Sequence, residues 1–134
     1  MIVYAYTDGA SRGNPGQSGI GIILKDEQGN TLASHFDFIG TTTNNVAEYK
    51  ALLHCLKMAQ ETKCRHLIVH SDSELMVRQL QGSYKVKDKG LRRYFDEARH
   101  MLSSSPFTFE IRHIAREENR QADELANRGI NLKG

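Results

Sequence analysis

Residues 2–8 read IVYAYTD, an alternating stretch rich in aromatic and β-branched side chains that predicts a β-strand ending at Asp8. Residues 11–16 read SRGNPG, which is dense in turn formers and predicts a turn without regular structure. Two more strands are expected over 19–25 and 31–39, joined by a hairpin turn containing glycine. Three early strands with short connections predict an antiparallel meander.

The periodicity changes near residue 46, where apolar side chains begin to recur at helical spacing: Val46, Tyr49, Leu52, Leu53, Leu56 and Ala59. Asn44 or Asn45 is the expected N-cap of this helix, and Asn119 that of the last helix. Between them the pattern predicts a buried strand, two helices and another strand, over 67–70, 73–81, 90–103 and 107–113. This order predicts an α/β fold in which helices pack on the faces of a mixed sheet.

The chain of 134 residues is long enough for one domain, spanning 1–134, that buries about two-thirds of its unfolded surface. No apolar run approaches the roughly 20 residues of a membrane span, and the N-terminus does not resemble a signal peptide. Cys55 and Cys64 lack the neighbours of a zinc site, so we expect two free thiols in a reducing compartment. We therefore expect a cytoplasmic monomer with no membrane association and no obligatory protein partner.

The net charge of +2 is small, but basic side chains cluster between residues 78 and 93. This segment holds one acid, Asp88, and six basic residues: Arg78, Lys85, Lys87, Lys89, Arg92 and Arg93. Such a patch is of the kind that neutralises nucleic-acid phosphates. It is also typical of a solvated helix and loop surface, which is the interpretation that the segment taken alone favours, and both interpretations stay open.

Four acids occupy unusual positions. Asp8 and Asp72 are expected at the carboxyl ends of strands, where ligands bind in α/β sheets, although aspartate is also a common turn former. Glu48 and Asp123 lie on the apolar sides of helices, and Glu48 could alternatively form a capping box with Asn45. A carboxylate facing a core must be paired, protonated or bound to a metal. Converging acids predict a site for a hard cation such as Mg²⁺, and two such ions can cleave a phosphodiester.

Four segments, in order, resemble the motifs of the type 1 ribonuclease H family: YTDGASRGNPG at 6–16, TTNNVAE at 42–48, HSDS at 70–73 and NRQADELA at 119–126. The resemblance covers nearly the whole chain. It implies a ribonuclease H-like fold, with a five-stranded mixed sheet of three antiparallel and then two parallel strands, flanked by helices. The implied activity is endonucleolytic cleavage of the RNA strand of RNA–DNA hybrids, leaving 5′-phosphate and 3′-hydroxyl ends. The implied metal ligands for Mg²⁺ or Mn²⁺, two ions with substrate bound, are Asp8, Glu48, Asp72 and Asp123.

The resemblance also implies helper residues. Asn14 and Asn44 match positions that contact the hybrid in relatives, and Arg12, in the same turn as Asn14, is expected to do likewise. His113 has the family spacing of a catalytic histidine, ten residues before Asp123, while Arg116 matches an arginine found in other branches. His113 could also be a structural residue at a strand end, so the identity of the proton-transfer group stays open.

Two departures from the family pattern concern substrate binding. Glu74 stands where many relatives carry a neutral glutamine, and the chain has no Trp and no basic protrusion. Lys85, Lys87 and Lys89 are expected to replace the protrusion in part, and no separate hybrid-binding module is expected before the first strand. We therefore expect weak, salt-sensitive binding. The alternatives are a non-catalytic hybrid-binding module, which has no need of four acids, and a related nuclease that cuts double-stranded RNA or trims RNA ends.

Overall fold

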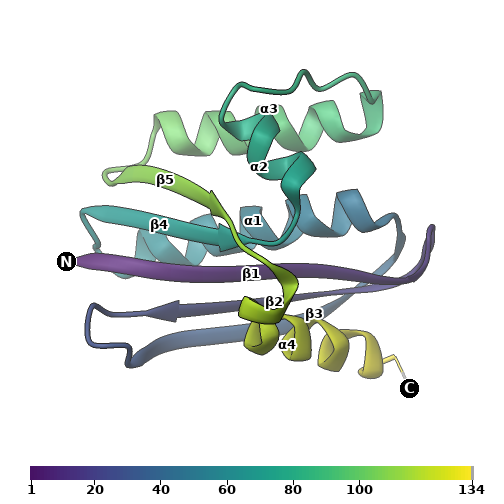
Figure 1. Ribbon diagram of the computed structural model, residues 1–134, viewed down its shortest axis with the longest axis horizontal. Helices are drawn as coiled ribbons and strands as arrows, with labels where there is room; N and C mark the ends of the chain where they lie inside the picture. The colour runs from purple at the N-terminus through teal and green to yellow at the C-terminus, as the bar shows by residue number, and fades with distance from the viewer. Residues whose placement is uncertain (134) are drawn as a thin grey trace.

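The computed structural model describes residues 1–133, which form a five-stranded sheet in the order β3-β2-β1-β4-β5 (Figure 1). The first three strands are antiparallel, and β4 and β5 are parallel to β1. This architecture confirms the predicted mixed sheet. The strands span Ile2–Gly13 (β1), Gly16–Lys25 (β2), Thr31–Thr42 (β3), His66–Ser71 (β4) and Thr108–His113 (β5).

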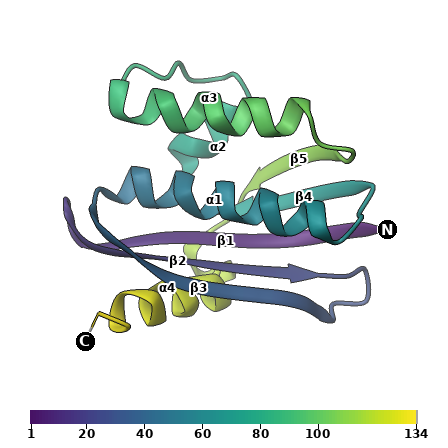
Figure 2. The ribbon, with the colours of Figure 1, turned by 180° about the vertical axis from the view of Figure 1, so that it is seen from behind.

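Four α-helices flank the sheet. Helices α1 to α3 lie on one side, with α3 packed mainly against α1, while α4 crosses the opposite face over β2 (Figures 1 and 2). A short 3-10 helix, η1, precedes α4. The helices span Asn44–Glu61 (α1), Glu74–Leu80 (α2), Lys89–Ser103 (α3), Arg116–Glu118 (η1) and Arg120–Asn131 (α4). Within residues 1–133, no helix has both the length and the apolar character needed to cross a bilayer.

The main core lies between the sheet and α1. Alternate residues of β1 and β4 point toward it, and fully burying each large aliphatic side chain contributes about 1.5–3 kcal/mol. Its fully buried members include Val3, Leu24, Leu52, Leu56, Leu67 and Val69. On the other face α4 lies directly on the backbone of β2. A Cβ atom on Gly19 would lie 2.3 Å from the carbonyl oxygen of Ala126, so a residue without a side chain allows this close approach.

The first hairpin is longer than predicted. Strand β1 does not end at Asp8 but continues to Gly13, and its pairing with β2 runs as far as Gly13–Gly16. The segment 11–16, predicted to be irregular, therefore forms the end of this hairpin. Turn-forming residues are tolerated in the ladder because Gly13 adopts a φ of 110° and the Ser11 and Ser18 hydroxyls hydrogen-bond across it at 2.6 Å. Asp8 consequently lies within a strand.

One predicted helix cap is wrong, and another is right in position but makes no capping hydrogen bond. The N-cap of α1 is Thr43, whose Oγ1 accepts a hydrogen bond from the Val46 amide, and not Asn44 or Asn45. Asn119 does occupy the N-cap position of α4, but its side chain makes no capping hydrogen bond. Sequence preference alone could not distinguish adjacent polar residues or foresee that Asn119 has another partner.

Candidate active site

Three carboxylates meet at the carboxyl end of β4. The parallel pairing of β1 with β4 ends at Thr7–Ser71, so Asp8 and Asp72, the next residues, lie beside each other. Glu48 joins them from the first half of α1. One carboxylate oxygen from each of Asp8, Glu48 and Asp72 lies within 4.8 Å of the other two. The predicted convergence of these three acids is therefore present in the structure.

Glu48 is oriented by the backbone of β1. Its Oε1 accepts a hydrogen bond from the Gly9 amide at 2.8 Å, so the capping-box interpretation is wrong. Gly9 allows this contact because a Cβ atom there would lie 2.2 Å from the carbonyl carbon of Ala47. The absence of a side chain at one position of β1 thus brings the helix and its carboxylate against the strand.

Burial and mutual repulsion make these acids unusual. Burial raises the pKa of Asp8 to about 8, with additional contributions from the negative charges of Asp72 and Asp123. Burial also raises the pKa of Glu48 well above its ordinary value, followed by the charges of Asp8 and Asp72, while the Gly9 amide opposes the shift. Among residues 1–133, no ion pair within 4.0 Å involves Asp8, Glu48 or Asp72.

The fourth acid, Asp123, lies beside the other three acids but outside the group that they form. Asp123, in the first turn of α4, is half-buried, and its negative charge contributes to the raised pKa of Asp8. It does not belong to the group of acids within 4.8 Å of one another. Its Oδ1 lies 4.0 Å from Nη2 of Arg116, whose side chain is 79% exposed. The full set offers only carboxylate oxygens, which are the ligands that a hard divalent cation prefers.

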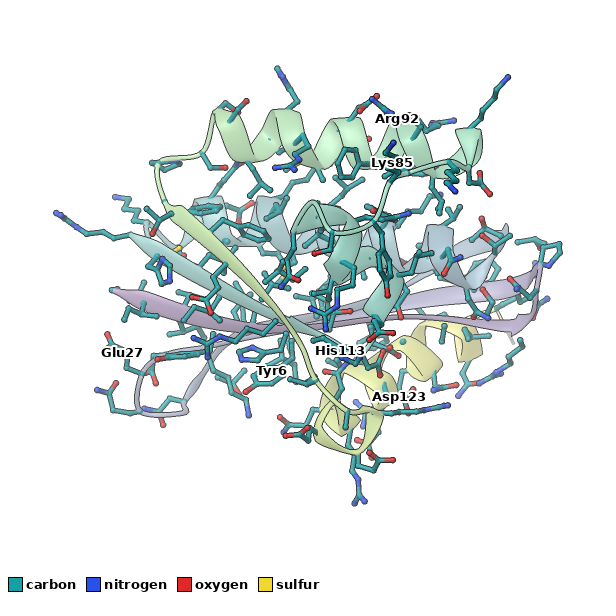
Figure 3. The ribbon with its side chains drawn as sticks, turned by 45° about the horizontal axis from the view of Figure 1, so that its top comes forward. Tyr6, Glu27, Lys85, Arg92, His113 and Asp123 are labelled. Atoms are coloured by element: carbon teal, nitrogen blue, oxygen red, sulfur yellow. The ribbon has the colours of Figure 1, made fainter. Side chains whose placement is uncertain are left out.

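An open depression of about 460 Å³ lies over Asp8, Glu48 and Asp72, and Asp123 is not part of its lining. Both candidate proton-transfer residues, His113 and Arg116, line it, as does Asn44. Figure 3 shows His113 at the end of β5, on the same side of the molecule as Asp123. Gly9, Ala10 and Ser11, from the motif at 6–16, also line it, together with two residues that had no distinctive sequence signal, Ile114 and Ala115.

The predicted substrate-binding residues divide into two groups. The first group lies near the hairpin end. The backbone amide of Asn44 donates a hydrogen bond to Asn14 Oδ1 at 3.0 Å. The exposed Arg12 side chain donates to Asn127 Oδ1 at 3.4 Å. Three exposed lysines do not line the depression: Lys85, Lys87 and Lys89. They lie on the α2–α3 connection and at the start of α3, and Figure 3 shows Lys85 and Arg92 on the side of the molecule that carries α3.

Comparison with known proteins identifies the class. The family described as "Reverse transcriptase-like" matches residues 6–129. A Neisseria meningitidis serogroup A protein named Ribonuclease HI is 32% identical over 145 residues, covering 96% of this chain and 95% of that protein. The crystal structure of LC11-RNase H1 in complex with RNA/DNA hybrid has a TM-score of 0.94 and 44% identity, and covers 98% of both chains. The chain therefore belongs to the type 1 ribonuclease H family.

One relative is considerably longer. The Ribonuclease HI of Halobacterium salinarum is 40% identical over 128 residues, which cover 96% of this chain. The chain spans 64% of the length of that protein.

Proposed function

We propose that this protein is an endoribonuclease that hydrolyses the RNA strand of RNA–DNA hybrids, using one catalytic domain that spans residues 1–134. The observation that carries the proposal is the meeting of three acids, Asp8, Glu48 and Asp72, under an open depression. Among the described residues, none of the three forms an ion pair within 4.0 Å. The similarity to LC11-RNase H1, whose structure contains such a hybrid, supports the choice of substrate. A monomeric state and a cytoplasmic location stay predictions.

The residues fit a site for two Mg²⁺ or Mn²⁺ ions held by Asp8, Glu48, Asp72 and Asp123. When bound, such ions activate water and stabilise the leaving oxygen of a phosphodiester. Asp8 and Glu48 must lose their protons to act as ligands, and their raised pKa values link metal binding to proton release. The products are expected to carry 5′-phosphate and 3′-hydroxyl groups.

Two side chains on the rim can assist the departure of the 3′-oxygen. Arg116 is permanently charged and lies 4.0 Å from Asp123, so it can stabilise negative charge. His113 is exposed and can donate a proton. Among the described residues His113 makes no hydrogen bond through its ring, whereas Arg116 has its carboxylate partner. This difference favours Arg116 as the main contributor.

Polar and basic residues around the depression are proposed to hold the duplex. Asn44 lines the depression and Asn14 hydrogen-bonds to Asn44, while Arg12 lies at the end of the β1–β2 hairpin. Their side chains can hydrogen-bond to sugar and phosphate groups. Lys85, Lys87 and Lys89 are proposed to contact phosphates farther from the scissile bond, which makes binding sensitive to salt.

The direct test is cleavage of a labelled RNA–DNA hybrid with Mg²⁺ or Mn²⁺, compared with RNA and DNA duplexes of the same sequence. Asp8→Asn and Asp72→Asn should abolish turnover, while Asp26→Asn, at an exposed turn, should cleave at the wild-type rate. Hybrid binding without cleavage in either metal would instead support a binding module. Preferential cleavage of the RNA duplex would support a nuclease with another substrate.

A further inference from the structure

Asn119 makes a buried connection between two distant parts of the chain. It is 1% exposed, and its Nδ2 donates a hydrogen bond of 2.9 Å to the backbone carbonyl of Thr7. The two residues are 112 positions apart in the sequence. This bond joins the start of α4 to the middle of β1.

Each end of the connection is next to an acid of the site. Thr7 directly precedes Asp8. Asp123 lies one helical turn beyond Asn119, and its amide donates to the Asn119 carbonyl at 3.0 Å. Because a strand and a helical turn are both stiff, the bond constrains the separation of the Asp8 and Asp123 carboxylates.

Stability alone does not explain an asparagine at this position. Its Oδ1 is buried, and no donor within residues 1–133 hydrogen-bonds to it; the buried Thr7 Oγ1 is in the same situation. Unpaired buried polar atoms destabilise a fold, whereas an N-cap side chain that accepted a hydrogen bond from the first turn would support α4 directly, and the Asn119 side chain does not do so. Departures from such local rules are expected where a residue serves function.

The site needs a mechanical constraint of this kind. Asp8 and Asp123 repel each other when both are ionised, and the charge of Asp123 contributes to the raised pKa of Asp8. The nearby Arg116 is mostly exposed, so its attraction to Asp123 is weakened by solvent. An uncharged hydrogen bond to the strand backbone holds α4 in place whatever the charge of the acids.

We propose that Asn119 is a positioning residue that holds Asp123 close enough to Asp8 for both to bind the same metal centre. This inference rests on the proposed metal-dependent function. It assigns to Asn119 a role distinct from helix capping, because the amide is directed at β1 and not at the first turn of α4.

The test is Asn119→Ser, which supplies a good N-cap but lacks the reach to the Thr7 carbonyl. Calorimetric titration with Mn²⁺ should show binding weakened about tenfold, in the range found when groups supporting metal ligands are removed. The kcat for hybrid cleavage should fall while KM is unchanged. The matched control is Ile130→Val, which loses a buried methyl group at the other end of α4 and should retain wild-type Mn²⁺ affinity.

A double variant establishes whether Asn119 acts through Asp123. In the Asp123→Asn background, Asn119→Ser should weaken Mn²⁺ binding no further, because residues that act as one unit are not additive. Wild-type Mn²⁺ affinity in folded Asn119→Ser, or a full tenfold loss in both backgrounds, would overturn the role of Asn119. Failure of the wild-type protein to bind Mn²⁺ at all would instead overturn the metal centre on which that role depends.

Discussion

Replacing Asp8 by asparagine should abolish activity yet stabilise the metal-free protein near neutral pH. Burial, then the charges of Asp72 and Asp123, raise the pKa of Asp8 from 3.8 to about 8. Between these values the folded protein binds a proton that the unfolded chain has released. Folding stability therefore falls as the pH rises from about 4 to about 8, which is the opposite of the usual behaviour of a carboxyl group.

The size of the effect follows from the pH interval. From pH 4 to pH 7 about three units, at about 1.4 kcal/mol per unit, give an upper bound of about 4 kcal/mol. Asparagine removes the ionisation, but its amide must still be buried beside Asp72 and Asp123. We expect Asp8→Asn to be about 1–3 kcal/mol more stable than the wild type at pH 7, and equally stable near pH 4.

The assay is urea unfolding followed by circular dichroism between pH 4 and pH 8, in the presence of EDTA. Asp26→Asn is the control, because hydrogen bonds led by the Asn30 amide lower the pKa of Asp26. Its stabilising effect is present above its unfolded pKa, so the control should lose stability at neutral pH. If Asp8→Asn were no more stable than the wild type at pH 7, the electrostatic account of the site would be refuted.

Three further predictions concern substrate binding, catalysis and the core. Affinity for the hybrid falls as salt rises, and replacing both Lys85 and Lys87 by alanine should make the slope of log affinity against log salt less steep by about two, with kcat retained. An unchanged slope would mean that the duplex does not contact these lysines. Arg116→Ala should lower kcat by about 10²-fold and His113→Ala by less, and steady-state kinetics giving the reverse order would identify histidine as the main helper. Tyr49→Phe should cost about 1–3 kcal/mol in urea unfolding, because the buried Tyr49 hydroxyl donates to Gln79 Oε1 at 2.6 Å; a neutral effect would mean that Gln79 finds another donor.

Local sequence was sufficient for the order of the elements and for most of their positions. Alternation in 2–8 and helical spacing from Val46 encode which side of each element is buried, and burial dominates the choice of secondary structure. The same patterns singled out Glu48 and Asp123 as acids on apolar helix sides. Family motifs then supplied the activity, which no single carboxylate could indicate.

The boundaries that failed are those decided by distant partners. The first hairpin extends past Asp8 because β2 supplies pairing partners as far as Gly16, which overrides the turn preference of residues 11–16. Asn119 lies at the predicted N-cap, but its side chain does not cap the helix because it bonds to a carbonyl 112 residues away. A short window of sequence contains no information about such partners.

The sequence by itself therefore determined the fold class, the four acids and the order in which they occur along the chain. Only the tertiary structure decided which of them meet: Asp8, Glu48 and Asp72 form one group, and Asp123 lies beside it under the constraint of Asn119. The physical reason is that periodicity specifies the side on which a residue lies, whereas distances between elements depend on how closely their backbones approach. At Gly9 and Gly19 that approach depends on the absence of a side chain, and its consequence for the acids becomes visible only in three dimensions.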